Sequence, residues 1–360
     1  MVQPRISRIA LSLLPPAAPG GAGRIMVAAE ADGGPVGWAA CGYHGERWTD
    51  IERLARAVVG TVPSDTTRRH EALGLAGEPL ALQKGDLGGA GALDNAVLDL
   101  AARCAGVPLA LWLGGTHNAR VAVADRLRWA DAPADLAGDA RVGALVERAE
   151  TRVARHGFGT LTVACNDADP DQLVALLMAL RRAFGSRLAL RLDMTALAAA
   201  AARPLVEPAR DLAVSALIEP GIDVSVGPGR TLVPIAVTAC PEHGGILRGG
   251  VAQIMRILTN HNGGAVVALR LAALARVFQS EVLLGAGSGL AVEAALLGQL
   301  ARATPADLQP LDLGPDPVVA ATDGVTIVEG VLQLPDGPGL GITPDPALLA
   351  RAERRAEIAA

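Results

Sequence analysis

The hydrophobic pattern of the chain is most regular after Arg120, where short apolar runs alternate with longer segments of helical periodicity. The runs predict strands and the longer segments predict helices. Repeated strand–helix units are typical of a parallel α/β barrel, and seven or eight of them fit into this part of the chain. We expect strands near 121–127, 159–165, 187–193, 214–219, 231–238, 251–258 and 281–285, with helices at 134–155, 170–184, 264–278 and 289–303.

The two ends of the chain have a different pattern. Apolar stretches at 5–14 and 25–30 predict two strands, with a hairpin turn at 32–34 after the second. Helical periodicity is present at 51–59 and again from Ala90, and a glycine-rich loop precedes the first of these helices. The segment beyond Pro310 is rich in Pro and Gly and is expected to end in a short helix.

Two acidic residues come directly after predicted strands of the barrel. Asp193 follows the apolar run 188–192, and Glu219 follows the run 214–218. In consecutive strand–helix units, the residues that follow the strands lie at the same end of a barrel, where metal and acid/base sites are found. Strand-end acids also act as helix caps or ion-pair partners, so the two carboxylates alone leave the function open.

Composition narrows the class of protein. The chain has 360 residues, is 51% hydrophobic and carries a net charge of −5, which argues against a nucleic-acid partner. No apolar run reaches the length needed to span a bilayer, and the short run behind Arg5 and Arg8 lacks the features of a signal peptide. Four cysteines without CxxC spacing predict reduced thiols and a cytoplasmic protein. Lys84 is the only lysine.

Three segments carry a resemblance to a known family. They are the helix and Leu-Gly-Gly turn at 92–115, the Asn-Gly-Gly turn at 262–264 and the tail LPDGPGLG at 334–341. In this order they resemble the mandelate racemase/muconate lactonizing group of the enolase superfamily. The resemblance implies a modified (β/α)8 barrel closed by an α+β capping domain that both termini form. It implies a capping domain at 1–118, a barrel at 119–318 and a segment at 319–360 that returns to the cap.

The same resemblance implies a reaction. The family removes a proton next to a carboxylate and stabilises the resulting enediolate on a divalent metal, which three strand-end carboxylates hold. Asp193 aligns with the first ligand and Glu219 with the second, but Thr238 and Ala239 stand where the third belongs. The sequence therefore predicts no cofactor, or at most weakly bound Mg²⁺. Alternatively, the two acids form ion pairs with arginines such as Arg191, on the same strand face as Asp193.

The lysine bases of the family are also missing. Its strand-two Lys-x-Lys motif falls on Thr162 and Ala164, and its strand-six lysine falls near Leu258. Strand seven carries no histidine, and the Gly-Trp-Gly-Glu of the cap has become Gly-Trp-Ala-Ala at 37–40. The resemblance thus implies a retained scaffold whose usual catalytic groups are largely lost.

Other residues are candidates for the missing roles. His261, after the sixth strand, suits acid/base work at neutral pH or is simply a loop histidine. Arg256 is placed to bind a substrate carboxylate but stays protonated. Asp125 and Arg126, near the end of the first strand, form a further candidate pair or a salt bridge at the barrel rim.

Cys165 follows the second strand beside the lost lysine position. A thiolate there could move protons, whereas a buried neutral cysteine would not. Tyr43 and His44 lie where the cap loop of the family meets substrate, although a solvent-exposed loop is the simpler interpretation. The substrate-binding candidates are Tyr43, His44, Arg126, Arg191, Thr162 and Thr238.

Two classes of function therefore remain. One is a diverged isomerase or lyase that acts on a small carboxylate or carbonyl metabolite by metal-independent proton transfer. The other is a catalytically silent scaffold or binding protein that has kept the barrel. In either case we expect a small-molecule ligand, no membrane partner and a homo-oligomer.

Overall fold

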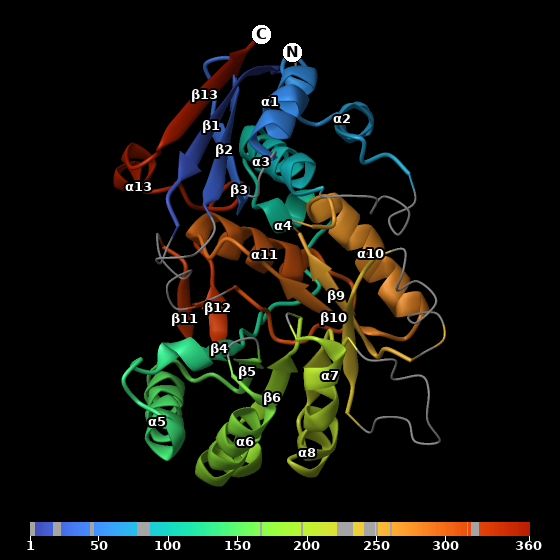
Figure 1. Cartoon of the computed structure of the whole chain (residues 1–360). Helices are drawn as coiled ribbons and strands as arrows, with labels where there is room; N and C mark the ends of the chain where they lie inside the picture. The colour runs from blue at the N-terminus through green and yellow to red at the C-terminus, as the bar shows by residue number, and fades with distance from the viewer. Residues whose placement is uncertain are drawn as a thin grey trace.

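The structure is a computed structural model, and it describes most of the chain. The described residues are 4–16, 23–43, 47–77, 87–165, 168–195, 197–221, 233–240, 249, 251–259, 261–314, 316–317 and 324–360. Both ends of the chain lie together at the top of Figure 1, in a cap above a barrel.

The cap is built on a four-stranded antiparallel sheet in the order β13-β1-β2-β3. Its strands are β1 (Ile6–Leu14), β2 (Arg24–Ala31), β3 (Val36–Gly42) and β13 (Arg354–Ala359). Because β13 pairs with β1, the last residues of the chain complete a sheet begun by the first ones. The helices of the cap are α1 (Arg47–Val58), α2 (Thr66–Leu73), α3 (Gly88–Cys104) and α4 (Leu109–Trp112).

The barrel is a parallel sheet of seven strands in sequence order. They are β4 (Asp125–Arg128), β5 (Thr160–Ala164), β6 (Ala189–Asp193), β7 (Ala216–Ile218), β8 (Ile235–Thr238), β9 (Ile254–Leu258) and β10 (Glu281–Gly285). The segment 308–312 closes the ring in the eighth position. Parallel bridges join it to β10 at Leu308 and Asp312 and to Val123 before β4 at Leu311.

Helices surround the barrel, and two short strands lie beside it (Figure 1). The helices are α5 (Gly138–His156), α6 (Pro170–Phe184), α7 (Ala199–Ala202), α8 (Val206–Asp211), α10 (Ala265–Val277) and α11 (Ala291–Ala303). β11 (Thr326–Val328) pairs with β12 (Val331–Gln333), and α13 (Pro346–Ala350) precedes β13. Ala, Leu and Val fill the cores, as expected for a chain with 2% aromatic residues.

The two terminal motifs of the sequence meet at Asp99 in α3. One carboxylate oxygen of Asp99 accepts the Leu340 N–H at 2.7 Å, and the other accepts the Trp38 N–H at 2.8 Å. A Cβ at Gly339 would lie 1.9 Å from Asp99 Oδ1, so only glycine fits there. This carboxylate therefore ties α3 to both β3 and the C-terminal segment.

The predicted fold class is confirmed, and the barrel helices α5, α6, α10 and α11 begin and end close to their predicted residues. The short helix expected near the end of the chain is α13, but the chain does not end there, because β13 follows it. Two strand positions had no sequence-based prediction, namely β3, which includes 37–40, and the closing segment 308–312. The exact domain boundaries at 118 and 318 stay predictions.

Candidate functional site

Three arginines and two aspartates form a cluster inside the barrel, which we call the arginine–aspartate cluster. Its members are Arg126, Arg191, Asp193, Arg256 and Asp312, contributed by β4, β6, β9 and the closing segment. Alternate residues of a strand share one face, so Arg191 and Asp193 of β6 both point into the barrel. The cluster lies toward the carboxyl ends of the strands, the end at which barrel enzymes hold substrate.

Arg126 connects the two aspartates. Its Nη2 lies 2.7 Å from Asp193 Oδ2, and its Nη1 lies 3.3 Å from Asp312 Oδ2. Arg256 approaches the same two oxygen atoms from its own strand, with Nη2 at 3.9 Å and 3.7 Å. The other oxygen of Asp193 accepts hydrogen bonds from the backbone and hydroxyl of Thr195. Both carboxylates are thus held by cations and hydrogen-bond donors.

Arg191 is fully buried, and not all of its hydrogen-bond donors have an acceptor among the described residues. Its Nε donates to Thr162 Oγ1 at 3.2 Å, and its Nη1 donates to the Pro310 carbonyl at 3.0 Å. Its Nη2 has no partner among the described residues, and the same holds for Nε of Arg256. Arg256 Nη1 donates to Thr195 Oγ1 at 3.0 Å. Buried donors without acceptors are costly, so these two N–H groups indicate a place for an anion.

The electrostatics of the cluster follow from its burial and its charges. Burial alone would raise the pKa of Asp193, but Arg126 and Arg256 lower it to about 2. Burial lowers the pKa of Arg191 to about 10, despite Asp312 nearby. Burial acts in the same direction on Arg126, but Asp312 and Asp193 outweigh it and raise the pKa of that guanidinium. At neutral pH Asp193, Arg126 and Arg191 are therefore charged, and the cluster brings three guanidinium groups together with two carboxylates.

Glu219 lies at the end of β7 and is separate from the ion pairs of the cluster. Its carboxylate accepts a hydrogen bond from the Thr238 backbone N–H, and no described residue forms an ion pair with it. Its φ is +50°, an uncommon conformation for a residue with a side chain. Backbone strain of this kind is concentrated at functional sites.

Asp125 does not pair with Arg126, contrary to the sequence-based pairing. Neighbouring residues of a strand point to opposite faces, and Asp125 faces α5. There Arg152 binds its carboxylate through both Nε and Nη2, the latter at 2.6 Å. Asp125 is therefore part of an ion pair outside the barrel.

The role expected of His261 stays a prediction, whereas the structure disfavours the one expected of Cys165. His261 lies in the turn after β9, its residue is exposed, and its side chain has no hydrogen bond or ion pair to another described residue. Cys165 is buried beside Asp193, and burial and that carboxylate together raise the pKa of the thiol to about 12. A thiolate at neutral pH is thereby disfavoured.

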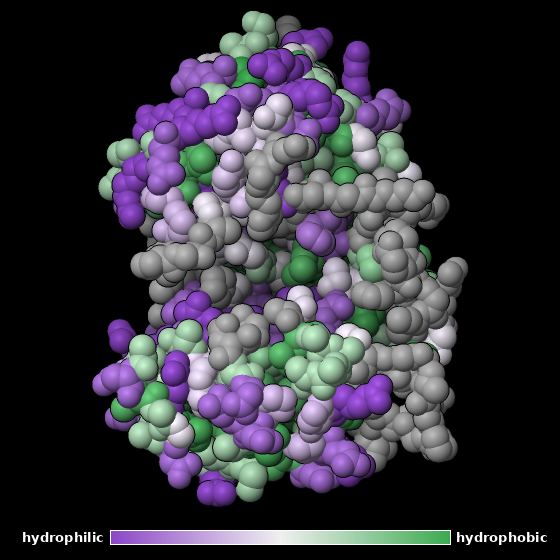
Figure 2. Space-filling view, in the orientation of Figure 1, coloured by the Kyte–Doolittle hydropathy of each residue, from purple (hydrophilic) through white to green (hydrophobic). Residues whose placement is uncertain are grey.

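The cap loop candidates are placed only in part. Tyr43 is half-buried after β3, where its N–H donates to the Gly23 carbonyl, and it packs against the core of the cap. His44 lies outside the described residues. Figure 2 shows a hollow between the upper, cap half and the lower, barrel half of this face.

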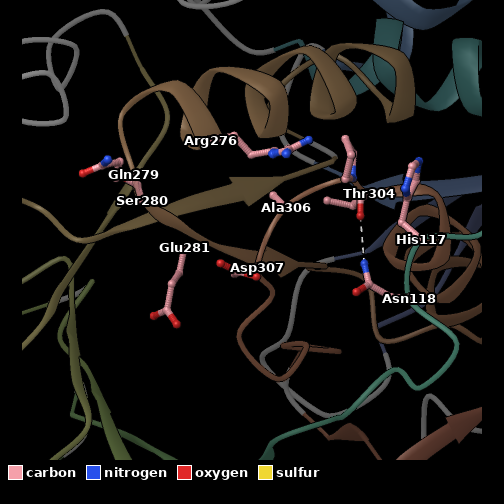
Figure 3. Close-up of a pocket in the computed structure, with 10 residues that line it drawn as sticks. His117, Asn118, Arg276, Gln279, Ser280, Glu281, Thr304, Ala306 and Asp307 are labelled. Atoms are coloured by element: carbon pink, nitrogen blue, oxygen red, sulfur yellow. Dashed lines mark hydrogen bonds between the residues drawn. The ribbon is translucent and has the colours of Figure 1, made fainter.

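A pocket of about 540 Å³ lies at the opposite end of the barrel, around the start of β10. In Figure 3 the side chains of Arg276, Glu281, Asp307 and His117 surround it, and all four residues are exposed. Asn118 is engaged with the backbone of Thr304 at 2.8 Å. This pocket contains none of the predicted site residues.

Sequence reasoning missed Asp312. It lies between Leu311 and Leu313 in the segment described as the Pro/Gly-rich tail. The available signal was weaker than for Asp193, because no apolar run of strand length precedes the acid and only a glycine follows it closely.

Comparison with known proteins supports the fold and the resemblance. Residues 229–348 match the family model described as enolase C-terminal domain-like. An isomerase from Streptomyces coelicolor A3(2) has a similar structure, with a TM-score of 0.81, 22% identity, and coverage of 97% of this chain and 99% of that one. The muconate lactonizing enzyme of Pseudomonas putida gives a TM-score of 0.78, 19% identity, and 97% and 99% coverage.

A third structure carries ligands. It is an enolase from Thermobispora bispora complexed with magnesium and formate, with a TM-score of 0.75, 22% identity, and coverage of 97% of this chain and 92% of that one. No curated protein sequence matches this chain. Among the described helices, none combines the length and the apolar character needed to cross a membrane.

The described residues do not fit the divalent metal that the resemblance implies. Both oxygens of Asp193 are engaged, one by Arg126 and the other by Thr195. Thr238 offers no carboxylate at the third position, and no group of three or more His, Cys, Asp or Glu in the described part of the chain could hold a metal. A divalent cation beside Asp193 would also face the guanidinium groups of Arg126 and Arg256, which repel it.

Proposed function

We propose that this chain, which has the fold of the mandelate racemase/muconate lactonizing group of the enolase superfamily, is an isomerase or lyase for a small carboxylate. It transfers a proton next to the carboxylate without a metal. The observation that carries the proposal is the arginine–aspartate cluster, with its two buried N–H groups that have no acceptor among the described residues.

The cluster suits one carboxylate. Three guanidinium groups and two carboxylates leave a net charge of +1, which a single bound anion neutralises. Arg191 Nη2 and Arg256 Nε are the donors without partners in the described part of the chain, and both arginines are buried. A hydrogen bond to a charged group contributes about 1.5–3 kcal/mol in such surroundings. The bound carboxylate therefore occupies the space between β6 and β9.

The arginines also stabilise the product of proton removal. An enediolate carries more charge on its oxygens than the substrate, so fixed cations stabilise it more strongly than the substrate. Arg191 remains protonated at neutral pH even with its pKa lowered to about 10. Its donors therefore stay available throughout the reaction.

Glu219 is the residue that we assign as the base. It follows β7, it is held by the Thr238 N–H, and it has no ion pair with another described residue. Asp193 is a poor base because its pKa is about 2, and Cys165 is a neutral thiol. The hydrogen bond from the Thr238 N–H fixes the direction of the Glu219 carboxylate.

The test is exchange of substrate hydrogen for deuterium. A panel of small carboxylates with a C–H bond next to the carboxyl group is incubated with the protein in D2O containing EDTA, and the signal is followed by proton NMR. We expect exchange with the wild type, a loss of about 100-fold or more with Glu219→Gln, and weaker carboxylate binding with Arg256→Gln. Asp336→Asn, at an exposed carboxylate, serves as the matched control.

Two outcomes would contradict the proposal. Exchange that stops with EDTA and returns with Mg²⁺ would restore Asp193 and Glu219 to the metal-ligand role that the resemblance implies. Carboxylate binding without any exchange would instead support the second class, a binding protein that has kept the barrel. The buried neutral thiol of Cys165 and the exposed His261 favour that second class.

A further inference from the structure

We infer that Arg126 is a built-in cation that takes the place of a divalent metal in this barrel. The inference concerns the same site as the proposed function, but it does not depend on turnover. Arg126 stands on the first barrel strand and Asp312 in the closing segment, and neither aligns with a metal ligand in the resemblance.

The geometry of the contacts is that of a bridging cation. The two terminal nitrogens of Arg126 reach different carboxylates, at 2.7 Å to Asp193 and 3.3 Å to Asp312. A planar guanidinium presents donors in a fork and can hold two acceptors at once, which a lysine ammonium does less well. Arg256 adds a second guanidinium within 4 Å of the same oxygen atoms.

Burial makes a cation necessary at this place. The side chains of Asp193 and Asp312 are 4% and 6% exposed, and that of Arg126 is 17% exposed. Two carboxylates that are buried this deeply have lost most of their hydration, and they repel each other. A cation between them offsets both costs. The chain supplies this cation covalently, so a free metal ion has no place beside Asp193.

Removal of the arginines should therefore create a metal site. In the double variant Arg126→Met/Arg256→Met, the carboxylates of Asp193 and Asp312 lose both guanidinium groups and are left without the cation that their burial requires. We expect Mn²⁺ to bind this variant at least about tenfold more tightly than the wild type. Electron paramagnetic resonance of free Mn²⁺ measures the binding, and Mn²⁺ should also raise the melting temperature of the variant.

Two variants serve as controls. Arg103→Met removes an arginine of similar exposure, 16%, that is paired with the single carboxylate of Asp99, and it should gain no Mn²⁺ binding. Addition of Asp312→Asn to the double variant should abolish the gained binding, because one of the two carboxylates is then neutral.

The inference is overturned if the folded double variant binds Mn²⁺ no better than the wild type. The wild type gives a second test that does not depend on folding of the variant. Mn²⁺ that binds the wild-type barrel and is lost in Asp193→Asn would show that a metal, rather than Arg126, occupies the site. Neither readout uses turnover, so failure of the exchange assay alone contradicts the proposed function and leaves this inference standing.

Discussion

Replacement of Asp193 by Asn tests the electrostatics of the cluster. Asn keeps the shape of the side chain and an oxygen that can accept from Arg126, but it removes the negative charge. The barrel should still fold, because Asp312 remains beside Arg126 at 3.3 Å and Arg256 at 3.7 Å. The variant therefore reports the contribution of one charge to the free energy of unfolding.

The size of the effect follows from the pKa of Asp193. Its ordinary value of 3.8 is lowered to about 2 in the folded protein. At about 1.4 kcal/mol per pKa unit, this corresponds to about 2 kcal/mol of stability at neutral pH. For a chain of this length, with an unfolding entropy of about 2 cal/mol/K per residue, that equals a loss of about 3 °C in melting temperature.

The pH dependence gives the sign of the effect. Because the folded pKa lies below the unfolded one, the stabilisation is fully present above the unfolded value of 3.8 and is lost as the pH falls through about 2. Melting temperatures of wild type and Asp193→Asn should thus differ at pH 7 and converge at acid pH. The exposed control Asp336→Asn should differ from wild type by less than about 0.5 kcal/mol throughout.

Two results would refute this reasoning. The first is an unchanged melting temperature at pH 7, which would mean that the ion pairs contribute nothing. The second is a wild-type melting temperature that EDTA lowers to that of Asp193→Asn, which would make the carboxylate a metal ligand.

Three further predictions concern a thiol, a glycine and the assembly. At pH 8 iodoacetamide should label the exposed Cys104 but leave Cys165 unmodified. The reason is that a thiol with a pKa of about 12 is ionised at pH 8 in roughly one molecule in 10,000. Rapid labelling of Cys165 in the folded protein would contradict this. Gly339→Ala should lower the free energy of unfolding by more than about 3 kcal/mol in a denaturant titration. The alanine Cβ would lie 1.9 Å from Asp99 Oδ1, and the φ of residue 339 is +66°. A change below about 1 kcal/mol would show that the contact adjusts. Light scattering should return a homo-oligomer, and a monomer at micromolar concentration would refute that expectation.

Much of the barrel could be predicted because its elements are defined locally. Helices such as α6 begin at a capping residue, Asp169, and carry a regular apolar face, so their bounds are visible in the sequence. The strands β3 and β13 were missed because their sequences are weakly apolar or charged. β13 is a strand only because it pairs with β1, more than 300 residues away.

The site was predicted less completely, for a geometric reason. Strand alternation correctly placed Arg191 and Asp193 on one face and suggested a role for Arg256. It could not show that Arg126 of the first strand reaches across β5 to Asp193 of the third, because that contact depends on the curvature of the sheet and on the side-chain conformation. Asp312 was hidden because the segment 308–312 becomes part of the sheet only by joining β10 to Val123 when the barrel closes.

The alternation rule also explains the clearest error. Asp125 and Arg126 are consecutive residues of a strand, so they cannot share a face, and Asp125 binds Arg152 on the helix side instead. His261 was selected for its residue type and its position after a strand, but the turn exposes it.

A crystal structure of the wild type, grown with Mn²⁺ and a small carboxylate that the exchange assay identifies, tests the central claim most directly. The account predicts the carboxylate on Arg191 and Arg256, Arg126 between Asp193 and Asp312, and no anomalous manganese signal in the barrel. A manganese ion ligated by Asp193 and Glu219, with Arg126 displaced, would contradict it.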